Sequence, residues 1–194
     1  MPGRGDRTRT LLARPSKGTV IQATKEQIVQ RLVKAHEAYF DVTTPYAFAG
    51  RSFAGYAEFH SYGERYVLSR RAKLWEVSTH EYLFFDCLDR LDVAALEDAV
   101  AFMKTHAIEK VQPGPTHMSS AISLVIVADA VDEDAARALR ATRYRKNFKL
   151  GFHGWSDLRL AAIDASTRRL CTNGAGKVLR DVLRANAGPN EAHV

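Results

Sequence analysis

The chain has 194 residues, of which 46% are hydrophobic, and a formal net charge of +6 at pH 7. This length fits one domain with its own hydrophobic core. No uninterrupted apolar stretch is longer than the one at residues 124–128, which is far shorter than the roughly 18 residues that a membrane-spanning helix needs. The N-terminus lacks the apolar segment of a signal peptide. We therefore expect a cytoplasmic protein with no membrane partner.

The positive charge is concentrated at the N-terminus. Residues 1–20 hold five basic side chains against the single acidic Asp6, namely Arg4, Arg7, Arg9, Arg14 and Lys17. The composition predicts a basic, flexible tail over residues 1–23, a single α+β domain over 24–186 and a flexible C-terminal tail over 187–194. Two cysteines inside apolar strand patterns favour reduced core thiols over a disulfide framework.

The chain from Thr24 to Asp41 shows the pattern of an amphipathic helix. Thr24 followed by Gln27 is a capping box, in which each side chain binds the backbone N–H of the other residue. Apolar residues then recur at helical spacing over the following turns. The pattern predicts a first helix that ends near Asp41 and is followed by a loop.

Residues 53–87 form the densest run of aromatic and β-branched residues in the chain. From Phe53 to His60 the polarity alternates with a period of two, which is typical of a half-buried strand. Turns are predicted at residues 62–64 and again at 78–80. We therefore expect a meander of three or four antiparallel strands, with helices covering one face.

The second half of the chain mixes helices and strands. Asp92 is the predicted N-cap of a second helix, and the β-branched run over residues 120–129 indicates a central strand buried on both faces. The remaining predicted elements are a helix over 132–143, strands over 148–152, 158–163 and 169–172 with a turn at 165–167, and a last helix with Val178, Leu179, Val182 and Leu183 facing inward. This order predicts an α+β fold with an antiparallel β-meander, a buried central strand, a C-terminal hairpin and about four helices.

Six segments together carry a resemblance to a known family. They read AGYAEFHS, ERYVL, AKLWE, HEYLFF, FHGWSDL and CTNGAGK. In these segments the chain resembles a family of uncharacterised bacterial proteins, found mostly in anaerobes, to which no activity is attached. The likeness spans roughly residues 24–185. It implies one conserved domain and supplies no catalytic residue.

Histidines and nearby carboxylates are candidates for a ligand or metal site. In the predicted meander His60 and His80 approach each other from two strands, and imidazole with carboxylate suits zinc or iron. A histidine, a glycine and a tryptophan at 153–155 also suit a small-molecule pocket. The candidate set is Glu58, His60, Glu76, His80, His153 and Trp155. No two histidines have HxH or HxxxH spacing, so the simpler interpretation is ordinary hydrogen-bonded histidines, and the cofactor stays unknown.

A basic segment follows the third predicted helix and suggests nucleic-acid binding. Its members, interleaved with aromatic residues, are Arg137, Arg140, Arg143, Arg145, Lys146 and Lys149. Such a pattern can hold phosphates and stack bases, although a solvated helix face with cations near the helix C-terminus is the simpler interpretation. The predicted topology also resembles a nuclease fold, but no acid of the meander has the lysine two residues later that this type of site requires.

A glycine-rich turn precedes the last helix and suggests an anion site. Gly174, Gly176 and Lys177 lie where free N–H groups at a helix start can hold an anion. A phosphate-binding P-loop is excluded because Cys171 and Val178 stand where its motif needs Gly and Ser or Thr. A plain connection between a strand and a helix is the alternative.

No catalytic motif emerges from these patterns. We expect a protein of unknown function that acts through self-association or binding, with homo-oligomers formed by the aromatic meander. Two alternatives stay open. One is a nucleic-acid-binding protein that uses residues 137–149, and the other is a metal- or ligand-dependent enzyme with a His/Glu site on the meander.

Overall fold

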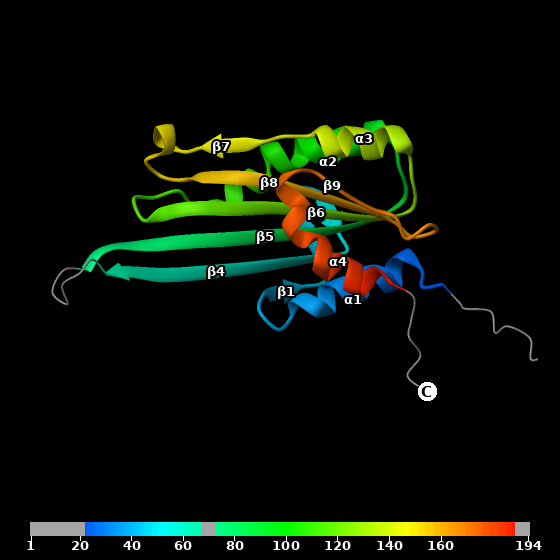
Figure 1. Cartoon of the computed structure of the whole chain (residues 1–194), viewed down its shortest axis with the longest axis horizontal. Helices are drawn as coiled ribbons and strands as arrows, with labels where there is room; N and C mark the ends of the chain where they lie inside the picture. The colour runs from blue at the N-terminus through cyan, green and yellow to red at the C-terminus, as the bar shows by residue number, and fades with distance from the viewer. Residues whose placement is uncertain (1–21, 67–72, 189–194) are drawn as a thin grey trace, which may run out of the picture.

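A seven-stranded mixed sheet forms the centre of the protein (Figure 1). The computed structural model describes residues 22–66 and 73–188, and it describes side chains outside residues 62–77. Nearly all of the predicted basic tail and the last six residues therefore lie outside what is described.

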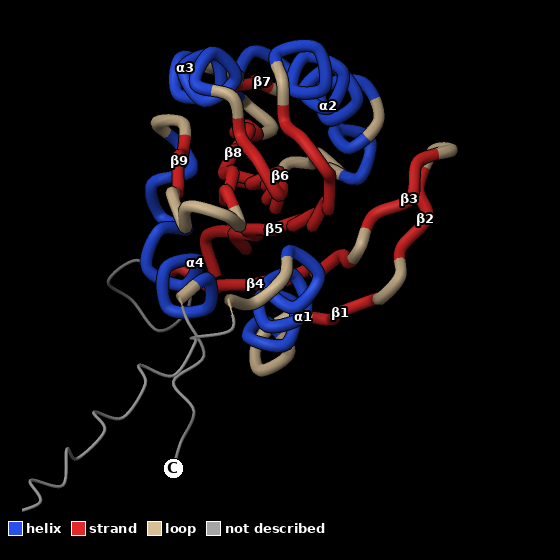
Figure 2. The backbone as a smooth tube through the Cα atoms, turned by 90° about the vertical axis from the view of Figure 1, so that its right-hand side faces the viewer, coloured by secondary structure: helices blue, strands red, loops and turns tan. Residues whose placement is uncertain are grey.

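The sheet has the strand order β1-β4-β5-β6-β8-β7, and β9 pairs with β8. Its strands are β1 (Asp41–Thr43), β4 (Gly55–Tyr66), β5 (Lys73–Leu91), β6 (His117–Val131), β7 (Arg145–Asn147), β8 (Trp155–Asp164) and β9 (Leu170–Thr172). The central pairs β5–β6 and β6–β8 are parallel, and the outer pairs are antiparallel. A separate two-stranded ribbon, β2 (Tyr46–Phe48) with β3 (Arg51–Phe53), stands beside the sheet (Figure 2).

Helices cover both faces of the sheet (Figure 2). The helices are α1 (Lys25–His36), α2 (Val93–Thr105), α3 (Glu133–Ala141) and α4 (Arg180–Ala187), with short 3-10 turns η1 (Ala107–Lys110), η2 (Lys149–Gly151) and η3 (Ala175–Leu179). α2 and α3 lie over the core that contains Phe84 and Leu124, and α1 and α4 lie over the core that contains Phe85 and Val125. Consecutive residues of a strand therefore enter opposite cores, because side chains alternate between the two faces.

Several predictions from the sequence are confirmed. The α+β class is correct, Thr24 and Gln27 form the capping box of α1, and the Asp92 side chain accepts a hydrogen bond from the Ala95 N–H at 2.8 Å at the start of α2. β6 is buried on both faces over residues 120–128. The C-terminal hairpin is also present, as β8 and β9.

The predicted meander needs correction. The predicted turns at 62–64 and 78–80 are both wrong, because β4 runs unbroken from Gly55 to Tyr66 and β5 runs unbroken from Lys73 to Leu91. Its polar residues at 78–80 stay in the strand because they pair with β4 on one side and begin the pairing with β6 on the other. The three-stranded antiparallel part is instead β1-β4-β5, and residues 53–87 contribute a single long hairpin to it.

Three smaller predictions about the second half are wrong. Residues 148–152 contain the turn η2 (Lys149–Gly151) instead of a strand, since Lys149 and Leu150 have positive φ angles of 44° and 56°. Val178 is 66% exposed instead of facing inward, because the chain there forms η3 and not an α-helix. Ala187, placed in the predicted C-terminal tail, is the buried last residue of α4. In the described ranges, no helix has the length and apolar character needed to cross a membrane.

Candidate functional site

A row of polar side chains crosses the sheet at one level. It consists of His60 on β4, His80 on β5, Ser120 on β6 and Ser156 on β8, which are successive partners in the strand register. Residues two positions apart on a strand lie on the same face of the sheet. Tyr82, two positions from His80 on β5, belongs to the core that α2 and α3 cover. All four polar residues therefore lie on that face. The sheet face therefore changes from apolar to polar along the strands.

Two imidazoles meet in this row. His60 and His80 sit directly opposite each other on β4 and β5, and their Nδ1 atoms are 2.8 Å apart. The ring of His80 also lies parallel to that of His117, with ring centroids 6.0 Å apart. The approach of His60 to His80 is the one predicted from the sequence, whereas His117 was not among the predicted residues.

The tautomer of His117 follows from its partners. A backbone carbonyl only accepts hydrogen bonds, so His117 donates from Nδ1 to the carbonyl of His153 at 2.7 Å. In the neutral ring Nε2 is then an acceptor, and the Ser120 hydroxyl donates to it at 2.9 Å. A serine beside a held imidazole is the contact pattern of an activated nucleophile. However, Ser120 is only 3% exposed, so the pair is a buried hydrogen bond and not an open nucleophile.

Burial and like charges act together on His80. Desolvation lowers the pKa of this imidazole below the ordinary value of 6.5, and the neighbouring His60 and His117 lower it further. Further along the row, the hydroxyl of the fully buried Ser156 has no hydrogen-bond partner among the described residues. Protonation of His80 is thus disfavoured, and the Ser156 hydroxyl in the same row has no partner among the described residues.

The other predicted ligand or metal residues do not join the two histidines. Glu58 accepts a hydrogen bond from the Tyr56 hydroxyl at 2.6 Å, and this contact adds to burial in raising the pKa of Tyr56. His153 contributes its backbone carbonyl. Trp155 pairs in register with Ser119 and therefore lies on the opposite face from the row, while the side chain of Glu76 is outside the described set. No group of three or more metal-binding side chains occurs among the described residues.

His117 and Ser120 were missed for a definable reason. They join the row only through the parallel pairing of β5 with β6, whose register shifts between Ser78 and Thr79. No local pattern encodes the register between strands that are joined by a helix. The only signal in the sequence was the polar start of an otherwise apolar strand, HMSS before AISLVIV.

Beyond this row the hairpin projects from the sheet as a two-stranded ribbon (Figure 1). β1 pairs with β4 only up to Glu58, so residues 59–66 of β4 pair with β5 alone. Residues 73–77 of β5 likewise pair with β4 alone, because pairing with β6 begins at Ser78. Among the described strands, the outer edge of this ribbon has no partner.

A second unusual surface lies in the β7–β8 connection. Leu150 is 96% exposed and Phe152 is 83% exposed, at the turn η2. Leu150 adopts a left-handed backbone conformation with φ 56°, which is unfavourable for a side chain of this kind. The connection therefore presents two large apolar groups to solvent.

The basic residues predicted for nucleic-acid binding are divided over separate surfaces. Arg137 pairs with Asp134 on α3 at 3.0 Å, and Arg145 forms a bidentate contact with Asp157 on β8. The neighbouring Lys146 pairs with Ser156 in the register and so points to the other face of the sheet. The other members of the set also differ in position: Arg140 is on α3, Arg143 bonds to the carbonyl of Arg140, and Lys149 is on η2.

The turn predicted to bind an anion is filled by a side chain of the protein. Asn173, 1% exposed, accepts hydrogen bonds at Oδ1 from the Gly176 N–H at 2.7 Å and from the Leu160 N–H at 3.0 Å. Gly176 is required because a Cβ atom there would lie 2.4 Å from the Leu160 carbonyl oxygen. Gly174 and Lys177 are exposed beside this turn. The N–H of Gly176 is thus already used in packing η3 against β8.

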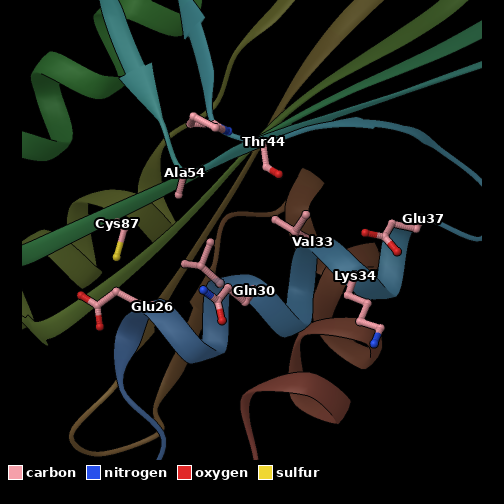
Figure 3. Close-up of a pocket in the computed structure, with 10 residues that line it drawn as sticks. Glu26, Gln30, Val33, Lys34, Glu37, Thr44, Ala54 and Cys87 are labelled. Carbon is pink, nitrogen blue, oxygen red and sulfur yellow. The ribbon is translucent and has the colours of Figure 1, made fainter.

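A pocket of about 540 Å³ opens between α1 and the edge of the sheet (Figure 3). One wall is a single face of α1 that includes Val29 and Val33, and the opposite wall includes Pro45, Ala54 and Cys87. This volume lies in the usual range of pockets for small molecules. The pocket was not predicted, because it depends on how far α1 stands from the connection between β1 and β2.

Comparison with known proteins identifies one family. The family model described as Domain of unknown function (DUF8052) matches residues 24–185. No curated protein and no solved structure matches the chain.

Proposed function

This chain belongs to the family Domain of unknown function (DUF8052), and we propose that it acts by binding, through the self-association of two copies along the outer edge of β4. The proposal rests on one observation. Residues 59–66 form a long strand edge that has no partner among the described strands.

The two edges of the sheet differ in how they are protected. β7, at one edge, has only three residues, two of which are Arg145 and Lys146. Short and basic edge strands resist pairing with other chains. At the other edge, residues 59–66 extend for about 27 Å at ~3.4 Å per residue, and their sequence FHSYGERY contains no proline and no lysine. Its charged residues, Glu64 and Arg65, and a register irregularity between Arg65 and Tyr66 lie at the far end of this edge, so residues 59–63 are its least protected part.

A second copy of the chain fits this edge by symmetry. Two identical strands that meet along the same edge in antiparallel orientation are related by a two-fold axis, so the contact is closed and stops at a dimer. Pairing of this kind gives partners to the outward N–H and C=O groups of β4. It also converts a two-stranded ribbon, which is marginally stable alone, into a four-stranded sheet.

The base of the ribbon is suited to hold it in place. His60 and His80 link its two strands on one face, and on the other face Phe59, 38% exposed, contacts Phe40 with ring centroids 5.6 Å apart. These contacts fix the direction in which the ribbon leaves the sheet. A fixed direction lowers the entropy cost of pairing with a second copy.

Sedimentation equilibrium of the whole chain at tens of micromolar tests the proposal. The parent protein is expected to have the mass of a dimer. A variant in which Asn-Gly replaces residues 63–77 joins Tyr62 to Ser78, which are opposite each other in the register, through a two-residue hairpin turn. This variant is expected to be a folded monomer.

Leu150→Ser provides the matched control, because it removes the most exposed apolar side chain of the described residues and leaves the ribbon intact. This variant is expected to remain dimeric. A monomeric parent, or a shortened-ribbon variant that remains dimeric, contradicts the proposal. Conversion to a monomer by Leu150→Ser alone would place the contact at η2 instead.

A further inference from the structure

From the pocket beside α1 we infer a binding site for a small organic cation, a molecule with an apolar body and a protonated amine. This site is separate from the β4 edge and does not depend on self-association. The volume and the lining of the cavity indicate that a small molecule binds there. The charged residues around one end of the cavity indicate that this molecule is a cation.

The apolar part of the pocket suits the body of such a ligand. Val29 and Val33 are buried on the α1 wall, and Pro45 and Ala54 stand across from them (Figure 3). Their side chains carry no hydrogen-bonding groups, so this part of the cavity favours aliphatic or aromatic surface. Next to Ala54, Gly55 packs closely against α1, where a Cβ atom would lie 2.7 Å from a methyl of Val33.

One end of the pocket is defined by Glu26 and Cys87 (Figure 3). Burial raises the pKa of the Cys87 thiol, and the carboxylate of Glu26 raises it further. A thiol at this end is therefore protonated and neutral at pH 7. The carboxylate of Glu26 likewise favours a positively charged ligand group, and because its side chain is 58% exposed, such a group keeps part of its hydration there.

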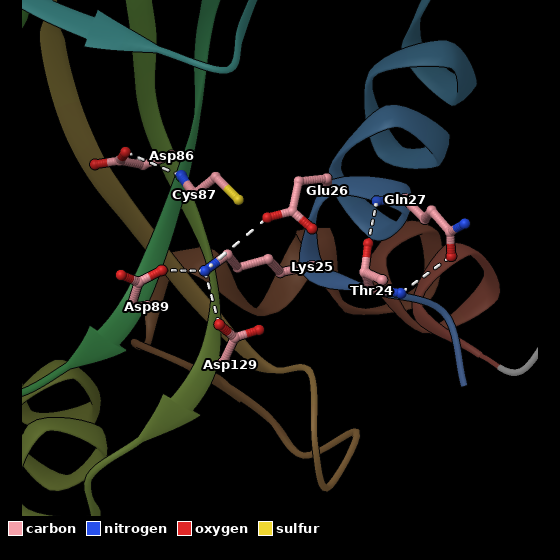
Figure 4. Close-up of polar contacts among 8 residues, drawn as sticks. All are labelled: Thr24, Lys25, Glu26, Gln27, Asp86, Cys87, Asp89 and Asp129. Carbon is pink, nitrogen blue, oxygen red and sulfur yellow. Dashed lines mark hydrogen bonds and ion pairs between the residues drawn. The ribbon is translucent and has the colours of Figure 1, made fainter. Parts of the chain in front are cut away.

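Only part of the negative charge at this end is neutralised within the protein. The ammonium of Lys25 is hydrogen-bonded to Asp89 and, at 2.7 Å, to Asp129, and it lies 4.0 Å from Glu26 (Figure 4). Three carboxylates thus share one lysine. The longest of the three contacts is to Glu26, which is also the only one of these three acids that lines the pocket.

The other nearby acid does not compete for the same lysine. Asp86 lies on the opposite face of β5 from Cys87, and Arg51 donates to it at 2.8 Å. Two further charged residues that line the pocket, Lys34 and Glu37, lie at its other end (Figure 3). At the Cys87 end the incompletely balanced carboxylate that lines the cavity is therefore Glu26. A protonated amine placed between Glu26 and Cys87 supplies the missing positive charge while its body occupies the apolar part.

Isothermal titration calorimetry with three six-carbon probes tests the inference. Hexylammonium, hexan-1-ol and hexanoate share one apolar body and differ in the charge of the head group. We expect hexylammonium to bind more tightly than hexan-1-ol and hexanoate to bind least. Glu26→Gln is expected to weaken hexylammonium binding about fivefold, the size of one partly exposed charge pair, without changing the binding of hexan-1-ol.

Glu97→Gln is the matched control, because Glu97 is an exposed acid on α2, on the other face of the sheet. This variant is expected to bind all three probes with unchanged affinity. A second readout does not depend on substitutions in the pocket. In a Cys171→Ser background, hexylammonium is expected to slow the alkylation of Cys87 by N-ethylmaleimide. The inference is overturned if hexanoate binds as well as hexylammonium, if Glu97→Gln weakens binding as much as Glu26→Gln, or if the rate of Cys87 alkylation does not change.

Discussion

The Nδ1 atoms of His60 and His80 lie 2.8 Å apart across the β4–β5 ladder. At this distance one nitrogen must donate a proton and the other must accept it. The contact is therefore incompatible with two fully protonated rings. The contact lies at the base of the ribbon. The protonation state of the two rings therefore affects how firmly β4 and β5 are joined there.

The first prediction concerns pH. The pKa of His80 is lowered in the folded protein, so between its folded pKa and 6.5 the unfolded state binds more protons than the folded state. The stability that neutral His80 contributes is therefore complete above pH 6.5 and is lost as the pH falls below that value. The free energy of unfolding, measured in urea, is expected to decrease from pH 7.5 to pH 5.5.

His80→Gln removes the titrating group and is expected to flatten this pH dependence, whatever its effect on stability at pH 7.5. His106→Gln, a change at the C-cap of α2, is expected to retain the parental slope. An unchanged slope in His80→Gln would assign the pH dependence to another group.

The second prediction concerns the ion pair between β3 and β5. The side chain of Asp86 is 7% exposed, and Arg51 donates to it at 2.8 Å. Arg51→Met leaves a buried carboxylate without its cation, which costs about 3 kcal/mol in the free energy of unfolding. Chemical denaturation of the parent and the variant measures this loss.

Arg90→Met is the comparison for this pair. Arg90 contacts Asp132 at 2.9 Å, but the two side chains are 68% and 32% exposed, so the expected cost is below about 1 kcal/mol. Similar losses in the two variants would mean that burial does not determine the value of the Arg51 contact.

The third prediction concerns Gly154, which lies beside the start of β6. Its φ angle is 74°, and a Cβ atom there would lie 2.4 Å from the carbonyl oxygen of Met118. Gly154→Ala therefore adds a steric clash to an unfavourable backbone conformation. We expect it to lower the free energy of unfolding by about 2 to 3 kcal/mol, as measured by denaturation in urea.

Gly151→Ala separates the two effects. Gly151 has a φ angle of 96°, and a Cβ atom added there would have no other atom within 4 Å, so only the conformational cost of about 1 kcal/mol applies. Equal losses for the two substitutions would show that the chain near Met118 moves to accept the additional atom.

Local signals in the sequence were sufficient for much of the fold. Thr24 and Asp92 marked the starts of two helices because their side chains cap N–H groups three residues away. The predicted strand 148–152 failed because two consecutive residues, Lys149 and Leu150, adopt positive φ angles that their side chains do not favour. The turn is closed by backbone hydrogen bonds from the N–H groups of Gly151 and His153 to the Phe148 carbonyl, which no pattern of side chains encodes.

The candidate site was predictable to the extent that it lies within one hairpin. His60 and His80 belong to strands that are neighbours in the sequence, so alternation and a turn brought them together. His117 and Ser120 reach the same level across a crossover that contains α2, and their register depends on a shift between Ser78 and Thr79. The pocket beside α1 depends on distances between elements that no periodicity encodes.

β5 is one unbroken strand that reaches both the pocket and the ribbon. Cys87 lies at the end that forms the pocket, and His80 lies where the ribbon begins. Between them, Phe84 and Phe85 are fully buried in opposite cores and hold the strand from both faces. The same strand therefore connects the two proposed sites through a segment that both cores hold in place, so a substitution at Phe84 or Phe85 is expected to disturb both sites together.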